Sequence, residues 1–309
     1  MNNVRRKLQI DEILREGIIG KDINIVIMDT GVARHPDLDG KIICFKDFVR
    51  GSQNGSFKSS DDGIDKMYDD NGHGTHIAGI CAGSGYLSKG RYKGVAPGAR
   101  LIVLKVLDNK GIGKEENIIK ACNWILDNKQ KYKIDIINIS FGTSEINKNT
   151  QIMNNCIENM WDKDIVVVAS AGNSGPKNDT VTSPGINSKI ITVGALENNE
   201  VVVINNKRLT DYSGRGKEGE YKPEVLAPAN RIVSCNNLYN LKSYTNKSGT
   251  SMATPIVSGC IALYKSVYKD CDNNQIKLNL CKSCTDLFRE KNRQGYGLID
   301  IRKFIYKNN

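Results

Sequence analysis

The chain has 309 residues, of which 39% are apolar and 25% are charged, which is enough for a sizeable core in one large domain or two small ones. Its longest apolar runs, such as Ile165–Ser170 and Ile190–Ala195, have the length of a strand and exclude a membrane-spanning chain. The formal net charge of +10 comes from lysines dispersed along the sequence, so it predicts a solvated surface and no nucleic-acid or membrane partner.

The first 20 residues form a short N-terminal extension with charges but no apolar segment of a secretory signal. Beyond it, apolar runs predict strands at Ile23–Asp29, Leu101–Leu107, Asp135–Ser140, Ile165–Ala169 and Ile190–Ala195. Helices are predicted from Thr75 onward and at Glu115–Asn128, Ile152–Trp161 and Ser251–Lys265. Strands that alternate with helices predict an α/β fold, with a mostly parallel sheet covered on both faces.

Polar residues follow three of these strands. Asp29 ends the first one, Ser140 ends the third, and Asn173 follows the fourth within a Gly-rich turn. Active sites of parallel sheets lie at the carboxyl ends of the strands, so these residues are candidates for a site. Two polar stretches, Gly51–Tyr68 and Asn198–Gly219, are predicted to be surface loops.

Ser251 is the candidate nucleophile. It lies in Ser-Gly-Thr-Ser-Met-Ala-Thr-Pro, where small residues precede a long apolar helix. A serine at a helix N-terminus has its own N–H pointing outward and a dipole that favours negative charge. The alternative is that Ser251 only caps the helix.

The candidate base is His73, in Asp-Asp-Asn-Gly-His-Gly-Thr-His, and the candidate carboxylate is Asp29, in Met-Asp-Thr-Gly. A base must accept the proton of the serine, and a carboxylate must orient that base. For Asp29 the alternative is an Asx turn. The spacing of His73 and His76 also raises a metal site, but the only other histidine is His35, so no metal-ligand set is predicted.

Asn173 can donate its side-chain amide to an oxyanion, and as a turn residue it can also have a purely structural role. The four motifs occur in the order Asp-Thr-Gly, His-Gly-Thr-His, Ala-Gly-Asn and Gly-Thr-Ser-Met-Ala-Thr-Pro. In this order the chain resembles the subtilisin-like serine proteases, or subtilases (peptidase family S8), from about Ile18 to Phe304. The resemblance implies a three-layer α/β/α fold as a single peptidase domain over residues 1–309.

The resemblance also implies the roles of the site residues. Asp29, His73 and Ser251 form the catalytic triad of a serine endopeptidase, and Asn173 with the N–H of Ser251 forms the oxyanion hole. The substrate, a polypeptide, then binds as an extended strand to residues from three segments: Gly111, Gly113, Ser140, Phe141, Gly142, Ser170, Ala171 and Gly172. Glycines in the last two segments are expected to leave room for a sizeable substrate side chain.

Several features favour the minor intracellular branch of the family. The short N-terminal extension leads us to expect a member without a propeptide, and the nine cysteines, an odd number without framework spacing, predict reduced thiols and a cytoplasmic location. Asp37 matches a usual calcium ligand, but residues 83–93 carry three cations and lack the usual asparagine. Calcium prefers sites rich in oxygen ligands, so no cofactor is predicted, with calcium left as an alternative.

The remaining motifs bear on specificity and biological role without deciding them. Asp69 and Asp70, just before His73, suggest a preference for a basic substrate residue. Cys281 and Cys284 are too isolated from further ligands for a metal site. The enzyme serves either protein turnover or the maturation of a peptide by removal of its leader. A catalytically silent, partner-binding protein of the same fold is expected to lack a residue of the site, and all four are present.

Overall fold

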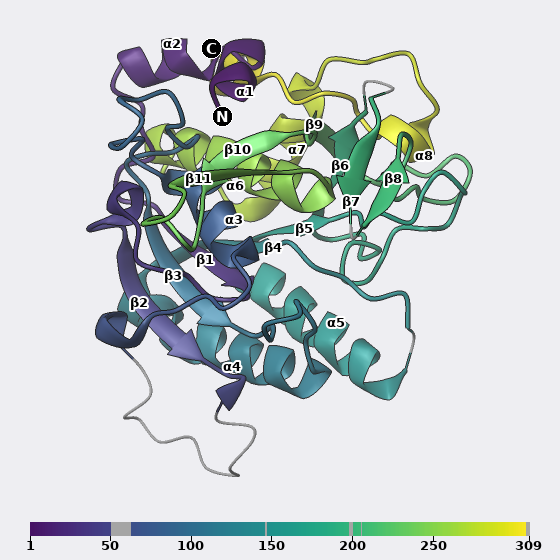
Figure 1. Cartoon of the computed structure of the whole chain (residues 1–309). Coiled ribbons are helices and arrows are strands. Elements are labelled where there is room, and N and C mark those ends of the chain that lie inside the picture. The colour runs from purple at the N-terminus through teal and green to yellow at the C-terminus, as the bar shows by residue number, and fades with distance from the viewer. Residues whose placement is uncertain (51–62, 146, 198–199, 205, 307–309) are drawn as a thin grey trace.

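A seven-stranded parallel sheet forms the centre of the computed structural model, which describes residues 1–50, 63–145, 147–197, 200–204 and 206–306 (Figure 1). The strands lie in the order β2-β3-β1-β4-β5-β6-β9, and every neighbouring pair runs parallel. Their bounds are β1 Asn24–Asp29, β2 Ile42–Asp47, β3 Arg100–Lys105, β4 Ile134–Ile139, β5 Val166–Ser170, β6 Ile191–Leu196 and β9 Val225–Pro228. Strands β1, β5 and β6 are buried along their whole length, which explains their continuous apolar sequences.

Helices cover both faces of this sheet. Helices α3 (His73–Ala82) and α6 (Thr250–Val267) pack against each other on one face, and α4 (Glu115–Tyr132) and α5 (Lys148–Asp162) on the other (Figure 1). The shorter helices are α1 Asn2–Lys7, α2 Ile10–Arg15, α7 Asn273–Ser283, α8 Lys291–Gln294 and α9 Ile301–Tyr306, with 3₁₀ turns η1 Pro36–Leu38 and η4 Ile64–Lys66. The predicted three-layer α/β/α architecture is confirmed.

The strand order brings the candidate residues together. The chain places β2 and β3 on one side of β1 and then crosses over to place β4, β5 and β6 on the other. Ligands of such sheets bind at the carboxyl edge where the order reverses. Asp29 ends β1 and Ser140 follows β4, and these two strands are direct neighbours.

Some predicted segments differ from the structure. The stretch Asn198–Gly219 is not only loop, because β7 (Val202–Ile204) and β8 (Lys207–Leu209) form an antiparallel hairpin within it. A three-residue strand whose middle residue is exposed is too short to be detected by its pattern. Of the predicted loop Gly51–Tyr68, residues 51–62 lie outside the described part of the chain. The sequence also did not predict β2, β9 or the second sheet, of β10 (Ile232–Cys235) and β11 (Tyr244–Lys247).

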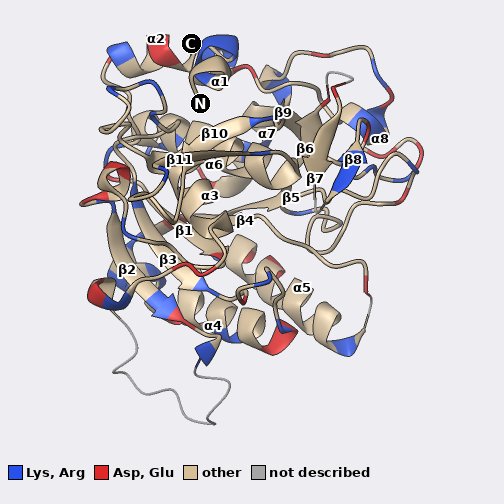
Figure 2. Ribbon diagram, viewed as in Figure 1, with Lys and Arg blue, Asp and Glu red and all other residues tan. Residues whose placement is uncertain are grey.

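The cysteines and the charges can now be located in the fold. None of the nine cysteines forms a disulfide bond. In Figure 2, Lys and Arg are scattered among Asp and Glu over many elements and are not gathered along one of them. In the described part of the chain, no helix combines the length and the apolar character that crossing a bilayer requires.

Candidate active site

Two glycines allow the segments of Asp29 and His73 to approach each other backbone to backbone. Gly31 has a φ of +115°, and a Cβ there would lie 2.2 Å from the carbonyl oxygen of Tyr68. A Cβ on Gly74 would lie 2.1 Å from the carbonyl oxygen of Gly31. No residue with a side chain fits either position without a shift of the backbone, which explains a glycine in each motif.

This approach produces a carboxylate–imidazole pair. The Nδ1 atom of His73 lies 2.7 Å from Oδ1 of Asp29, whose side chain is fully buried, while the His73 side chain is 23% exposed. The same Asp29 oxygen accepts a hydrogen bond from the N–H of Thr30 at 2.8 Å. With Nδ1–H donating to the carboxylate, Nε2 of His73 carries the lone pair and can accept a proton.

Asp69 holds the turn that leads into His73. Its Oδ1 accepts from the hydroxyl of Thr30 at 2.9 Å and from the N–H of Gly72 at 2.8 Å. Its Oδ2 accepts from both the N–H and the hydroxyl of Thr75, at 2.9 and 2.7 Å. Burial alone would raise the pKa of Asp69, but these hydrogen bonds hold it below its ordinary value. Asp69 therefore links the segment that follows Asp29 to the segment that contains His73 through hydrogen bonds.

Ser251 is the second residue of α6, which begins after Gly249 with a φ of +138°. Pro255 lies inside the first turns of this helix and has no N–H, so it cannot pair with the carbonyl four residues earlier. That carbonyl belongs to Ser251, and it accepts a hydrogen bond from the hydroxyl of Ser140 at 3.1 Å. A contact with Ser140, directly after β4, thus takes the place of the helical hydrogen bond that Pro255 cannot make.

A buried polar chain continues from this contact into the core. The side-chain amide of Asn138 donates to the hydroxyl of Ser140 at 2.9 Å, and the hydroxyl of Ser258 donates to Asn138 at 3.0 Å. The hydroxyl of Ser251 itself donates to the carbonyl oxygen of Ser140 at 2.8 Å. In this position it does not donate to His73, so a rotation about the Cα–Cβ bond of Ser251 must precede proton transfer.

Asn173 is anchored by one end of its amide. Its Oδ1 accepts hydrogen bonds from the N–H and the hydroxyl of Thr250, at 3.0 and 3.1 Å. An amide whose oxygen is held in this way has its Nδ2 donors left for another partner. Asn173 lines the same cleft as His73 and Ser251.

That cleft has a volume of about 550 Å³. Of the predicted substrate-binding residues, Gly111, Ser140, Phe141 and Gly142 line it, and Gly113 lines an adjoining pocket of about 490 Å³. Ser170, Ala171 and Gly172 line neither, and the side chains of Ser170 and Ala171 are buried. Ser140 acts through its contacts with Ser251, because its own side chain is only 2% exposed.

Thr182 was not predicted and changes the expected pocket. A Cβ on Gly142 would lie 2.3 Å from the Oγ1 of Thr182, and one on Gly172 would lie 2.7 Å from it. Thr182 therefore lies beside both glycines and borders the region expected to receive the substrate side chain. No sequence motif pointed to Thr182.

The two carboxylates just before His73 both have partners within the chain. Asp69 is turned inward, toward Thr30 and Thr75. Asp70 pairs at 2.8 Å with Lys105, whose side chain is almost fully buried and which also donates to the carbonyl oxygens of Thr30 and Leu107. A carboxylate neutralised by a buried ammonium group attracts a basic substrate residue only weakly.

The two closely spaced histidines have separate partners. His73 contacts Asp29, whereas Nε2 of His76 donates to the carbonyl oxygen of Ile232 at 3.0 Å. Burial first, and then the charges of Lys247 and His73, lower the pKa of His76 to about 3. His73 and His76 therefore do not form a metal site.

The residues at the family's calcium position do not fit the ion. Both carboxylate oxygens of Asp37 are engaged, one by the N–H of Leu87 at 3.0 Å and the other by the hydroxyl of Tyr244 at 2.8 Å. The guanidinium group of Arg5 donates to three carbonyl oxygens of the neighbouring loop, those of Gly90, Arg91 and Lys93, at 2.9, 3.4 and 2.6 Å. A cation of the chain itself thus occupies the carbonyl cluster.

Sequence reasoning also missed a buried cluster of His35, Asp37 and Cys235, whose candidate ligand atoms lie within 4.8 Å of one another. Nδ1 of His35 accepts from the N–H of Asp37 at 3.0 Å, and Nε2 lies 2.8 Å from the carbonyl oxygen of Ser243. Burial holds the pKa of Cys235 far above its ordinary value. His35 and Asp37 thus have hydrogen-bond partners within the chain, and we interpret the cluster as part of the core.

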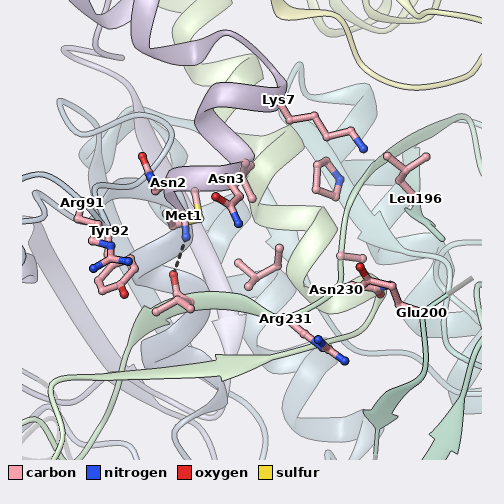
Figure 3. Close-up of a pocket in the computed structure, with 15 residues that line it drawn as sticks. Met1, Asn2, Asn3, Lys7, Arg91, Tyr92, Leu196, Glu200, Asn230 and Arg231 are labelled. Atoms are coloured by element: carbon pink, nitrogen blue, oxygen red, sulfur yellow. Dashed lines mark hydrogen bonds between the residues drawn. The ribbon is translucent and has the colours of Figure 1, made fainter. Parts of the chain in front are cut away.

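A second cavity, of about 420 Å³, lies beside α1 and the segment from β9 to β10 (Figure 3). The amino group of Met1 donates across it to the carbonyl oxygen of Val233 at 3.0 Å. Neither Asp29, His73 nor Ser251 lines this cavity. Hydrogen bonds join its wall to the turn that precedes Ser251: the N–H of Arg231 donates to the Ser248 hydroxyl at 2.8 Å, and the N–H of Gly249 donates to the carbonyl oxygen of Ala229 at 3.1 Å.

A buried carboxylate that orients an imidazole, beside a serine at a helix N-terminus and a free amide donor, defines a serine-type hydrolase site. Residues 20–297 match the model of the subtilase family, Peptidase_S8. The chain belongs to the subtilase family of serine endopeptidases.

Relatives agree with this assignment. The chain is 37% identical to serine protease AprX of Bacillus subtilis (strain 168), over 93% of its own length and 66% of that protein. It is 34% identical to the major intracellular serine protease of the same strain, over 84% of this chain and 73% of that one. Among solved structures, sphericase superposes with a TM-score of 0.76 at 31% identity, covering 91% of both chains.

Proposed function

We propose that the chain hydrolyses internal peptide bonds of polypeptides, with Ser251 as nucleophile, His73 as general base and Asp29 as the residue that orients His73. The observation that carries the proposal is the 2.7 Å contact between His73 and the buried Asp29 in the cleft that also contains Ser251. An acyl-enzyme mechanism follows from this geometry.

In the first half of the reaction, the Ser251 hydroxyl leaves the Ser140 carbonyl and turns to His73. Nε2 of His73 accepts the hydroxyl proton while Oγ attacks the substrate carbonyl carbon. The negative oxygen is stabilised by Nδ2 of Asn173 and the N–H of Ser251. The C–N bond then breaks, and His73 returns the proton to the leaving amine. A water molecule hydrolyses the acyl-enzyme by the same steps in reverse.

The substrate is proposed to bind as an extended strand between Gly111–Gly113 and the segment after β4. Backbone hydrogen bonds then supply most of the affinity, and specificity depends on the side chains around the cleft. Gly111 and Phe141 line both the cleft and its adjoining pocket, which gives this path two successive compartments.

The proposed setting is cytoplasmic, in protein turnover or in the maturation of a peptide. The similarity to a protein named as an intracellular serine protease supports the location. We further propose that the enzyme needs no metal or other cofactor, a view supported by the Arg5 guanidinium in the loop 90–93. No nucleic-acid or membrane partner is proposed.

The deciding experiment is labelling with a fluorophosphonate probe, which reacts covalently with an activated serine. The wild-type chain should be labelled and should cleave a denatured protein, whereas Ser251→Ala should do neither. Ser266→Ala serves as the matched control, since Ser266 lies on the same helix, away from the cleft, and its hydroxyl donates to the carbonyl of Leu263 at 2.7 Å. A folded wild-type chain without labelling or cleavage would instead support a silent, partner-binding protein.

A further inference from the structure

Two lysines supply the fixed charge of the cleft that contains His73 and Ser251. Lys110 precedes Gly111 on one wall, and Lys247 is the last residue of β11, four residues before Ser251. Among the described residues that line the cleft, these lysines and His73 are the only ionisable side chains. The cleft is therefore cationic and has no carboxylate in its described lining.

Neither lysine is neutralised by an ion pair within the described part of the chain. Lys110 is exposed and Lys247 is half-buried. The carboxylates close to them have partners elsewhere. Asp108 lies close enough to Lys110 for their charges to attract each other but forms no ion pair with it, and its Oδ1 accepts the backbone N–H groups of Ile112 and Lys110, each at 2.9 Å. Asp69 and Asp70 are held by Thr75 and Lys105.

We infer that the cleft selects polypeptides with Asp or Glu close to the scissile bond and that Lys110 and Lys247 recognise these carboxylates. The inference rests on the proposed function and adds the substrate class to it. An extended substrate that displaces water from the cleft brings its side chains close to the two ammonium groups. Attraction favours acidic side chains there, and repulsion disfavours basic ones.

The size of the effect follows from the exposure of the two lysines. An ion pair near the surface changes affinity by about two- to five-fold, so the two lysines together should favour an acidic peptide by roughly tenfold. Because they come from different elements, each lysine should act on a different position of the substrate. Salt should weaken the preference, since its screening length is about 3 Å at 1 M ionic strength.

The test uses peptides with one cleavable bond, in which each neighbouring position carries Glu, Gln or Lys in turn. The measured quantity is the ratio of kcat/KM for the Glu and Gln peptides, in the wild type, Lys110→Gln, Lys247→Gln and the double variant. Lys242→Gln is the matched control: Lys242 is exposed on the turn between β10 and β11 and does not line the cleft.

We expect the wild type and Lys242→Gln to favour Glu by several-fold, each single variant to lose the preference at its own position, and the double variant to show a ratio near one. Equal rates for Glu and Gln in the wild type would overturn the inference. A preference that persists in the double variant would overturn the assignment to these lysines. Labelling by the fluorophosphonate probe separates the two hypotheses. An enzyme that is labelled but cleaves the Glu and Gln peptides at equal rates refutes only this inference. A chain that is neither labelled nor active refutes the proposed function as well.

Discussion

Single hydrogen bonds determine how Ser251, the proposed nucleophile, is presented to the cleft. The Ser251 carbonyl is available because Pro255 lacks an N–H, and Ser140 uses that carbonyl to fix the first turn of α6. The Ser251 hydroxyl meanwhile rests on the Ser140 carbonyl. The position of Ser251 therefore depends on Ser140, which directly follows β4.

The two ends of the Asn173 side-chain amide have different partners, which leads to a prediction for this single residue. Asn173→Asp keeps an oxygen for the Thr250 contacts but removes the Nδ2 donor, so the oxyanion loses one hydrogen bond. We expect kcat to fall by about 10²- to 10³-fold, the loss measured for the equivalent donor in a subtilisin, with little change in KM. Steady-state kinetics on a peptide substrate measures both constants. A large rise in KM with unchanged kcat would place Asn173 in ground-state binding instead.

At the scale of elements, α3 connects the site to the small second sheet. His73 begins the helix, and one turn later His76 donates to Ile232 of β10 at 3.0 Å and to Thr245 of β11 at 3.2 Å. A Cβ on Gly79 would lie only 2.6 Å from the Sγ of Cys235 in β10. The helix and the sheet are thus tightly packed, and His76 is the polar group between them.

This contact predicts a pH dependence of stability. His76 has a pKa of about 3 in the folded chain and an ordinary value of 6.5, so between these pH values the unfolded chain binds the extra proton. Stability is therefore complete above about pH 6.5 and is lost as pH falls toward 3, by at most about 5 kcal/mol. His76→Gln keeps an N–H donor but does not titrate, so its melting temperature should fall less on acidification.

Comparing the wild type with His76→Gln separates the contribution of His76 to the pH dependence from the contributions of other titratable groups. Burial, and then Asp211, raise the pKa of Glu197 to about 7, so this carboxyl favours the folded state as pH falls from 7 toward 4.5. That opposing contribution is common to wild type and variant and cancels in their difference. Melting temperatures should be measured by calorimetry at pH 4, 5 and 7. The difference in melting temperature between the wild type and His76→Gln should become smaller as the pH falls. A constant difference would contradict the assignment.

At the scale of the whole molecule, buried and half-buried cations of the chain bind backbone carbonyls at widely separated places. Besides Arg5 and Lys105, the ammonium group of Lys277 lies within 3.1 Å of the carbonyl oxygens of Ser188, Lys189 and Ile190, and 2.8 Å from Glu224. Lys222 binds the other oxygen of Glu224 at 2.9 Å, and burial lowers its pKa to about 8. Clusters of carbonyl and carboxylate oxygens are the ligand sets that calcium uses in other proteins.

We therefore expect stability to be insensitive to calcium. Addition of EDTA, or of millimolar calcium after its removal, should change the melting temperature by less than about 1 °C, which is under 1 kcal/mol for a chain of this size. Differential scanning fluorimetry in both conditions is sufficient. Calcium at 100 times its dissociation constant would add about 2.7 kcal/mol, so a rise of several degrees would reveal a bound ion.

The sequence predicted what depends on local pattern and missed what depends on contacts between distant segments. The strands of the sheet centre and the motifs around Asp29, His73 and Ser251 were evident because apolar runs and Gly-flanked turns are local signals. Thr182 and the contact of Arg5 with the loop 90–93 were not, because their partners lie far away along the chain. The inward turn of Asp69 was missed for the same reason: its charge was visible, but the five groups that donate to it were not.

Lys277 illustrates what it means for a cation to be part of the chain. A bound metal ion obeys mass action, so its contribution to stability varies with the ion concentration of the surroundings. A tethered ammonium group is present at one per molecule in any medium, and dilution or chelation cannot remove it. The positive charge at this place therefore depends on the amino-acid sequence and not on the ions in the surroundings. Lys277→Met would leave three carbonyls and Glu224 facing an empty space into which a free sodium or calcium ion could bind.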